Sequence, residues 1–205
     1  MSKIVFGKKE INIVKTAYSL KRAVVLPTDT IYGITAPALD KKAVLNLYDL
    51  KGRNLEKPFI ILISSLDDLL AFGVKLDNKK SDWLKKIWPQ KITVTFPCNK
   101  KKFSYLHRGT GLLAFRIPDN KWLTQLIKIA GPIVAPSANT QGKVPAEIVR
   151  EAYEYFGDSV TYLDGGKIKG KASTIVSLEN NSFEIIRQGS YKLKKNEYFR
   201  SGSDN

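Results

Sequence analysis

Hydrophobic positions along the chain alternate between a helical period and short β-branched runs. Ile11, Val14 and Tyr18 recur at the spacing of a helix with one buried face. Residues 23–26 form a short apolar run that stops at Pro27, which is typical of a buried strand. The same reasoning predicts further helices over residues 41–50, 65–71, 81–87, 122–130 and 145–156. It predicts further strands over residues 59–63, 92–96, 112–117, 133–135, 160–163, 174–176 and 183–186.

Helices and strands in alternation predict an α/β (α+β) fold. Several strands follow one another without a helix between them, so we expect a twisted mixed sheet with flanking helices. No internal repeat and no linker rich in Pro, Gly or Ser divides the chain. We therefore expect a single domain over residues 5–190 and a C-terminal tail over residues 191–205. The lysine-rich segment 99–108 has no clear period and predicts a mobile loop.

Charge is the unusual bulk property of the sequence. Thirty-four Lys and Arg residues against nineteen Asp and Glu residues leave a formal net charge of +15. Such an excess attracts phosphate, either in a nucleotide or in a nucleic acid backbone. A surface coated with lysine for no specific purpose explains it equally well, so charge alone does not decide the function.

The cysteine and histidine content excludes two kinds of site. Cys98 is the only cysteine, so an intramolecular disulfide cannot form, and with His107 as the only histidine a Cys/His zinc site is out of reach. The first ten residues lack the apolar stretch of a signal peptide, and the longest apolar runs are too short to cross a bilayer. We therefore expect a soluble, cytoplasmic protein without a membrane partner.

Polar residues that an ordinary loop does not need lie at the ends of three predicted strands. Ligand sites of α/β sheets usually gather at strand ends, where a rigid scaffold brings side chains together. Hydroxyl and amide groups there can bind a phosphate or a carboxylate. The structural alternative is that Asp29 caps a turn and that residues 137–139 cap a helix. The candidate site residues are Thr28, Thr30, Ser137, Asn139 and Ser173.

Four cationic residues occupy positions that suggest anion binding. Lys51 and Arg53 come directly after a predicted helix, where they either complement its dipole or clamp a phosphate. Arg116 lies inside an apolar strand, where a charge needs a partner or a ligand. Arg187 ends another strand. Since the chain has neither a Walker motif nor a G-x-G-x-x-G fingerprint, a nucleotide must be held in some other way.

Taken together, these residues resemble the YrdC/Sua5 family. The recurring elements of that family are a P-T-[DE]-T-x-Y-G segment, a K-x-R pair after the next helix, a W-P-G-P-x-T segment, an x-x-R-x-P strand end, an S-A-N turn, an S-T-I strand start and a late R-x-G. The chain shows counterparts in the same order over nearly its whole length: Pro27 to Gly33, Lys51 with Arg53, Trp88-Pro89, Arg116 with Pro118, Ser137-Ala138-Asn139, Ser173-Thr174-Ile175 and Arg187-Gln188-Gly189. Its length is similar to that of the short, single-domain bacterial form.

The resemblance implies a YrdC-like sheet curved around a basic cavity, and a nucleotidyltransferase activity. The implied reaction converts L-threonine, bicarbonate and ATP into L-threonylcarbamoyl-AMP and pyrophosphate. The product serves the threonylcarbamoyl modification of the adenosine at tRNA position 37, and separate transferase proteins make the final transfer. Mg²⁺ would enter with ATP, bound mainly by the nucleotide and water, with no metal ligands from the protein. No covalent intermediate is implied, so catalysis would rest on positioning and on neutralising charge.

The resemblance also assigns roles to individual residues. Lys51 and Arg53 would be the catalytic cations. Threonine would be held by Thr28, Thr30, Arg116 and Ser173. ATP would be held by Lys51, Arg53, Lys57, Ser137, Asn139 and Arg187.

Four positions depart from the family pattern. Gln90 and Lys91 replace a Gly and a Pro in the W-P-G-P-x-T segment. Leu62 stands where many longer members have a His that contacts substrate, and Lys57 stands where an Asn often touches ATP. An alternative function is an RNA-binding module with the same fold that acts in ribosome or tRNA maturation and has no adenylation activity. The adenylating enzyme itself would bind tRNA or RNA only weakly. A lysine excess inside the cavity would favour ATP, whereas an outer basic stripe would favour RNA.

Overall fold

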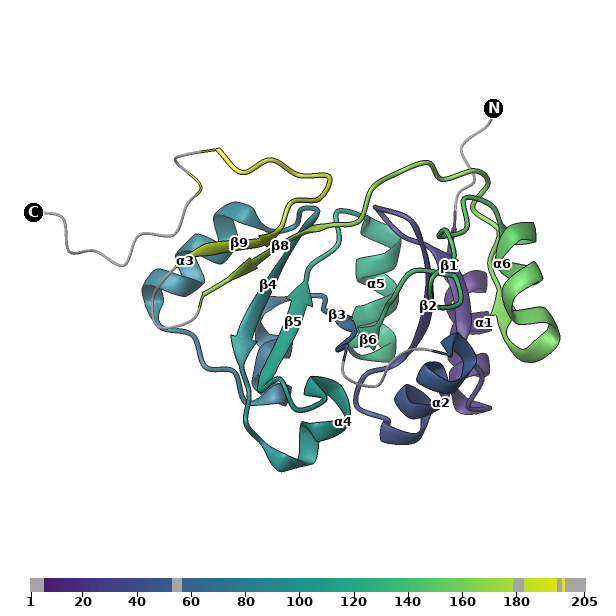
Figure 1. The fold of residues 1–205 in the computed structure, drawn as a ribbon, viewed down its shortest axis with the longest axis horizontal. Coiled ribbons are helices and arrows are strands. Elements are labelled where there is room, and N and C mark those ends of the chain that lie inside the picture. The colour runs from purple at the N-terminus through teal and green to yellow at the C-terminus, as the bar shows by residue number, and fades with distance from the viewer. Residues whose placement is uncertain (1–5, 53–56, 179–182, 195–196, 198–205) are drawn as a thin grey trace, which may run out of the picture.

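A mixed nine-stranded sheet forms the centre of the molecule (Figure 1). In this computed structural model, residues 6–52, 57–178, 183–194 and 197 are described. The strands are β1 (Val24–Pro27), β2 (Tyr32–Pro37), β3 (Ile60–Leu62), β4 (Ile92–Pro97), β5 (Leu112–Arg116), β6 (Ile133–Val134), β7 (Thr161–Tyr162), β8 (Thr174–Ser177) and β9 (Glu184–Arg187). They lie in the order β7-β1-β2-β6-β3-β5-β4-β8-β9, with parallel and antiparallel neighbours. The predicted mixed α/β sheet is confirmed.

Helices cover both faces of this sheet. The helices are α1 (Lys8–Ser19), α2 (Lys41–Lys51), α3 (Asn78–Ile87), α4 (Ser104–His107), α5 (Lys121–Ala130) and α6 (Val149–Phe156), with the short 3-10 helices η1 (Leu66–Phe72), η2 (Lys101–Phe103) and η3 (Gly157–Ser159). Helices α2, α3, α4 and α6 contribute to the larger core, whereas α1 and α5 contribute to the smaller one. Neighbouring residues of β1 show that the two cores lie on opposite faces, since Val24 and Leu26 belong to the smaller core and Val25 to the larger.

Side chains and glycines at the helix ends explain where two helices begin or stop. Asp40 precedes α2 as its N-cap, and its carboxylate accepts a hydrogen bond from the Ala43 amide at 3.1 Å. Gly131 ends α5 with a φ of 83°, a backbone conformation that glycine adopts without steric cost. These local signals fix the helix boundaries, and the apolar faces fix which side packs against the sheet.

Three elements differ from the prediction. Strand β2 was not predicted, because its buried residues do not alternate with polar ones and its sequence, YGITAP, contains Gly and Pro. The segment 99–108 is not a loop throughout: it contains η2 and α4, whose apolar side chains Phe103, Tyr105 and Leu106 are buried. The helix predicted over residues 145–156 begins only at Val149, so Pro145 lies before the helix and not in its first turn.

A long extended segment connects the two ends of the sheet. Residues 164–173, here called the strap, run from β7 to β8 and cross over the top of the molecule in Figure 1. Beyond β9, the described part of the predicted tail lies against α3, where the Trp83 indole donates to the Glu197 carbonyl at 2.6 Å. Within the described residues, no helix is both long and apolar enough to span a bilayer.

Candidate functional site

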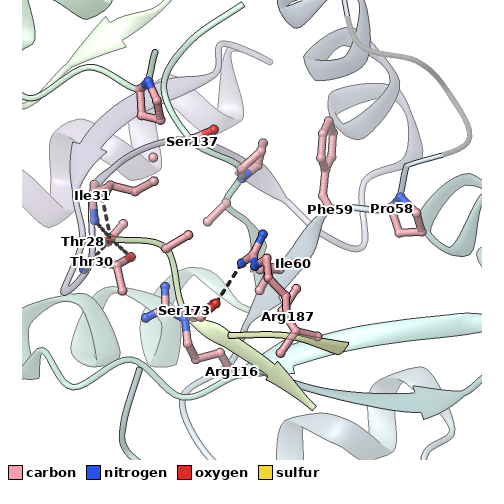
Figure 2. A pocket seen from close by; sticks show the side chains of 16 residues that line it. Thr28, Thr30, Ile31, Pro58, Phe59, Ile60, Arg116, Ser137, Ser173 and Arg187 are labelled. Carbon is pink, nitrogen blue, oxygen red and sulfur yellow. Dashed lines mark hydrogen bonds between the residues drawn. The ribbon is translucent and has the colours of Figure 1, made fainter. Parts of the chain in front are cut away.

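A cavity of about 350 Å³ lies where several strand ends meet (Figure 2). Ile60 and Ala135 line it and also pack against the smaller core, so the cavity lies beside α1 and α5 on their face of the sheet. Among the described residues, its wall contains two arginines and no carboxylate or lysine. Six of the ten predicted site residues line the cavity: Thr28, Thr30, Arg116, Ser137, Ser173 and Arg187.

The loop between β1 and β2 is held by the hydroxyl of Thr28. This Oγ1 donates to the Ile31 carbonyl at 2.6 Å and accepts from the backbone amides of Thr30 and Ile31 at 3.1 and 3.2 Å. The Thr30 Oγ1 lies 3.0 Å from the same hydroxyl. Thr28 therefore shapes the turn that presents Thr30 to the cavity, while its own hydroxyl is largely used inside that turn.

Arg116 ends β5 and forms a buried ion pair at the cavity wall. Its Nη1 lies 2.5 Å from Oδ1 of Asp29, and the side chains are only 5% and 2% exposed. The other oxygen of Asp29 accepts from the Asp119 amide at 3.2 Å. The Nε of Arg116 is buried and has no hydrogen-bond partner among the described residues. The structural alternative for Asp29 as a simple turn cap is therefore wrong, because its carboxylate reaches the end of β5, which is not adjacent to β1 or β2 in the sheet.

Another part of the wall comes from the start of β8 and from β9, with β4 beside them. The hydroxyls of Thr93 and Ser173 lie 2.8 Å apart, and the Arg187 guanidinium donates to the Ser173 carbonyl at 2.9 Å. A Cβ on Gly189 would lie within 2.4 Å of the Ser173 carbonyl carbon and oxygen, so only glycine permits this close approach. Arg187 and Ser173 are thus placed side by side by the backbone of two adjacent strands, as Figure 2 shows.

Lys51 lies outside the cavity wall and supports the turn after β6. Only 2% of the residue is exposed, and its Nζ donates to the Ser137 carbonyl at 2.5 Å and to the Asn139 carbonyl. Asn139 accepts from the Ser137 hydroxyl at 2.5 Å and donates to the carbonyls of Thr140 and Lys143. The described helices do not begin at residues 137–139, so the helix-cap alternative for this segment is wrong. Lys51 and Asn139 instead hold the turn that brings Ser137 to the cavity.

The remaining predicted residues lie beside the cavity or beyond the described part of the chain. Arg53 lies outside the described residues. Lys57 is exposed and directly precedes Pro58, which lines the cavity. Leu62 is fully buried in the smaller core and does not line the cavity. Lys91, one of the departures from the family pattern, is also absent from the wall, and its carbonyl accepts from the Thr174 amide at 3.0 Å.

Tyr32 anchors the strap next to the cavity. Its hydroxyl accepts from the Gly165 amide and donates to the Gly166 carbonyl, both at 2.8 Å. Burial raises the pKa of Tyr32 to about 12, and the nearby Asp164 carboxylate acts in the same direction, so the phenol stays protonated near neutral pH. Gly170 packs directly on the Thr30 carbonyl, since a Cβ there would lie 2.1 Å from that oxygen. The strap is therefore fixed to the same loop that carries Thr28 and Thr30.

The wall chemistry suits an anionic ligand with polar groups. Arginines and hydroxyls can bind carboxylate or phosphate. Neither Cys98 nor His107 lines the cavity, and within the described chain no group of three or more His, Cys, Asp or Glu residues could hold a metal ion. The exposed lysines are distributed over several elements, including α1, α2 and α3. In the described part of the chain, the charge of the wall thus comes from two arginines, and no lysine lines the cavity.

Comparisons with known proteins give close matches in sequence and structure. The model of the Sua5/YciO/YrdC family, described as telomere recombination, matches residues 20–189. A threonylcarbamoyl-AMP synthase of Pyrococcus abyssi is 31% identical over 85% of this chain and 52% of its own length. One from Bacillus subtilis is 32% identical over 81% of this chain and 49% of its own length. The structure of P. abyssi Sua5 complexed with L-threonine is 28% identical, with a TM-score of 0.83 over 91% of this chain and 56% of that one.

The chain spans about half the length of the two curated relatives. Within that span, the match covers the loop with Thr28 and Thr30, the end of β5 and the turn after β6. The family model ends at Gly189, which is the last glycine of the R-x-G element. Since this match takes in most of the sequence and every described residue that lines the cavity, the chain belongs to the Sua5/YciO/YrdC family.

Proposed function

We propose that the protein is a nucleotidyltransferase that forms L-threonylcarbamoyl-AMP and pyrophosphate from L-threonine, bicarbonate and ATP. The observation that carries the proposal is the Arg116 guanidinium at the cavity wall, whose buried Nε has no hydrogen-bond partner among the described residues. A buried donor without a partner is costly unless a ligand satisfies it. The names of the relatives, and the L-threonine in the related P. abyssi structure, indicate which ligand to test first.

The threonine end of the cavity is assigned to the residues around Arg116. An arginine can bind a carboxylate through two parallel hydrogen bonds, and Arg116 offers its Nε edge for that purpose. Thr30 and Ser173 carry hydroxyls in the same wall, which suits the amino and hydroxyl groups of threonine. Ile31 and Ile60 add apolar surface that suits its methyl group.

The nucleotide end is assigned to Arg187 and Ser137. Arg187 supplies the second positive charge of the wall, and Ser137 is held in place by Lys51 and Asn139. No carboxylate lines the cavity among the described residues, which suits Mg²⁺ held by the ATP phosphates and water. Arg53 and Lys57 remain proposed phosphate contacts, on the family pattern alone.

The reaction needs positioned substrates more than a reactive side chain. The threonine amino group combines with bicarbonate to give a carbamate with loss of water. A carbamate oxygen then attacks the α-phosphorus of ATP, the bond to the β-phosphate oxygen breaks, and pyrophosphate leaves. Arg187 would neutralise charge on the phosphates, while Arg116 and the hydroxyls would hold the carbamate in line. The product would then pass to tRNA-modifying transferase proteins, which act on the adenosine at tRNA position 37.

Pyrophosphate release under omission of each substrate tests the proposal. We expect release only when threonine, bicarbonate and ATP are all present. Serine in place of threonine should be turned over more slowly, since one methyl group contributes about 1–3 kcal/mol of discrimination. Equal release without bicarbonate, or with alanine in place of threonine, would show that the assigned reaction is wrong.

A further inference from the structure

The ion pair between Asp29 and Arg116 has two features that stability alone does not explain. The side chains are almost completely buried, and the guanidinium nevertheless lines the cavity. Burying an ion pair usually stabilises a fold no more than well-packed apolar residues would, because both charges lose their hydration. An ion pair at the wall of a binding cavity therefore calls for an explanation in terms of the ligand.

The Arg116 guanidinium is paired through Nη1, whereas its Nε has no hydrogen-bond partner among the described residues. Nη1 donates a hydrogen bond to Oδ1 of Asp29 at 2.5 Å. The Nε, on the other side of the planar group, has no partner among the described residues. Nε and Nη2 lie on the same edge of a guanidinium, and together they make the fork that binds a carboxylate with two parallel hydrogen bonds. The pairing with Asp29 thus leaves a bidentate edge for a ligand.

Both the carboxylate and the backbone of Asp29 are held in place. Its second oxygen accepts from the Asp119 amide at 3.2 Å, just after β5, while its backbone belongs to the turn that Thr28 closes. The carboxylate therefore cannot follow the guanidinium if the latter rotates. Arg116 has a long side chain with several rotatable bonds, and fixing it before the ligand arrives removes an entropy cost from binding.

We propose that Asp29 is a positioning residue that orients Arg116, so that the Nε–Nη2 edge receives the α-carboxylate of the amino acid substrate. This role rests on the proposed function in one respect, namely that the substrate carries an α-carboxylate. Asp29 lies behind the wall and acts only through Arg116. Removing its charge affects the amino acid step and leaves nucleotide binding at Arg187 and Ser137 unchanged.

The test compares the KM values for threonine and ATP in the pyrophosphate assay. In Asp29→Asn the side chain keeps its shape but loses the charge that holds Nη1. We expect the threonine KM to rise about tenfold or more, as for the loss of one charge-assisted hydrogen bond, with the ATP KM within about twofold of wild type. Asp29→Glu keeps the charge and displaces it by one methylene, so its threonine KM should lie between those of wild type and Asp29→Asn.

Asp40→Asn is the matched control. Asp40 also accepts a backbone amide and pairs with a cation, Lys21 at 2.6 Å, but it lies outside the cavity wall. This variant should lose stability without a change in either KM. A parallel rise of both KM values in Asp29→Asn, or an unchanged threonine KM, overturns the positioning role. If Asp29→Asn does not fold, Asp29→Glu decides in the same way: a raised threonine KM alone supports the role, and an unchanged one overturns it.

The assay also separates this inference from the proposed function. Wild-type protein that releases no pyrophosphate with threonine overturns the proposed function and the positioning role with it. Active wild-type protein with an unaffected Asp29→Asn variant overturns the positioning role alone.

Discussion

Replacing Lys51 by methionine should destabilise the fold, because this lysine holds a turn of the backbone. Its Nζ donates to the carbonyls of Ser137 and Asn139, and the residue is 2% exposed. Methionine fills a similar volume but cannot donate a hydrogen bond. Both carbonyls then lose their charged partner in a place with little access to water.

The expected loss follows from these two bonds. A hydrogen bond to a charged group contributes about 1.5–3 kcal/mol, so the two together contribute about 3–6 kcal/mol. Methionine avoids the cost of burying an ammonium group, which offsets part of that sum. We therefore expect the free energy of unfolding to fall by about 2–4 kcal/mol, which most domains survive. The ATP KM should rise as well, since Ser137 lines the cavity.

Urea unfolding followed by tryptophan fluorescence measures this loss, since the chain has three tryptophans. Lys85→Met is the control: Lys85 is 65% exposed, lies near the end of a helix, and pairs with Asp82 at 3.4 Å. Its substitution should change stability by less than about 0.5 kcal/mol. A Lys51→Met protein with wild-type stability and reduced activity would refute the structural role. It would favour direct contact between Lys51 and phosphate.

Three further predictions follow from the described contacts. Gly170→Ala should lower stability and raise the threonine KM, because its Cβ would lie 2.1 Å from the Thr30 carbonyl; wild-type values for both would contradict the tight packing of the strap. The pKa of Tyr32 is raised to about 12, so the folded state keeps this proton where the unfolded state loses it, and stability should fall as the pH rises from about 10 to about 12. In Tyr32→Phe this fall should be smaller, measured by urea unfolding at each pH; an identical slope would contradict the shift. His107→Ala and Cys98→Ser should leave turnover within about threefold of wild type, because neither residue lines the cavity, and a hundredfold loss would require acid–base or nucleophilic chemistry.

The sequence pattern predicted the fold where periodicity and burial agree. The faces of α1 and α5 repeat at helical spacing and pack as predicted. Strand β2 escaped prediction because it is buried on both faces, which removes the alternation that identifies a half-buried strand. Helix α4 was not predicted, because only two of its residues, Tyr105 and Leu106, are buried and a run of lysines precedes it.

The site was predicted as a set of residues but not as a set of contacts. Thr30, Ser173 and Arg187, which polar residues at strand ends indicated, line one cavity, and their roles in binding stay predictions. The partner of Arg116 was missed, because Asp29 is separated from it by 87 positions and a turn-cap role explained Asp29 locally. An arginine inside an apolar strand predicts that a counter-ion lies nearby, but it does not identify the residue that provides the carboxylate.

In the proposed reaction, the protein adenylates a threonine carbamate and not threonine itself. Mass spectrometry of the nucleotide product, formed from ATP, threonine and carbon-13 bicarbonate, tests this most directly. We expect an AMP adduct that carries one carbon-13 per molecule, formed in equal amount to pyrophosphate. An unlabelled threonyl adenylate, or AMP without an adduct, would contradict it.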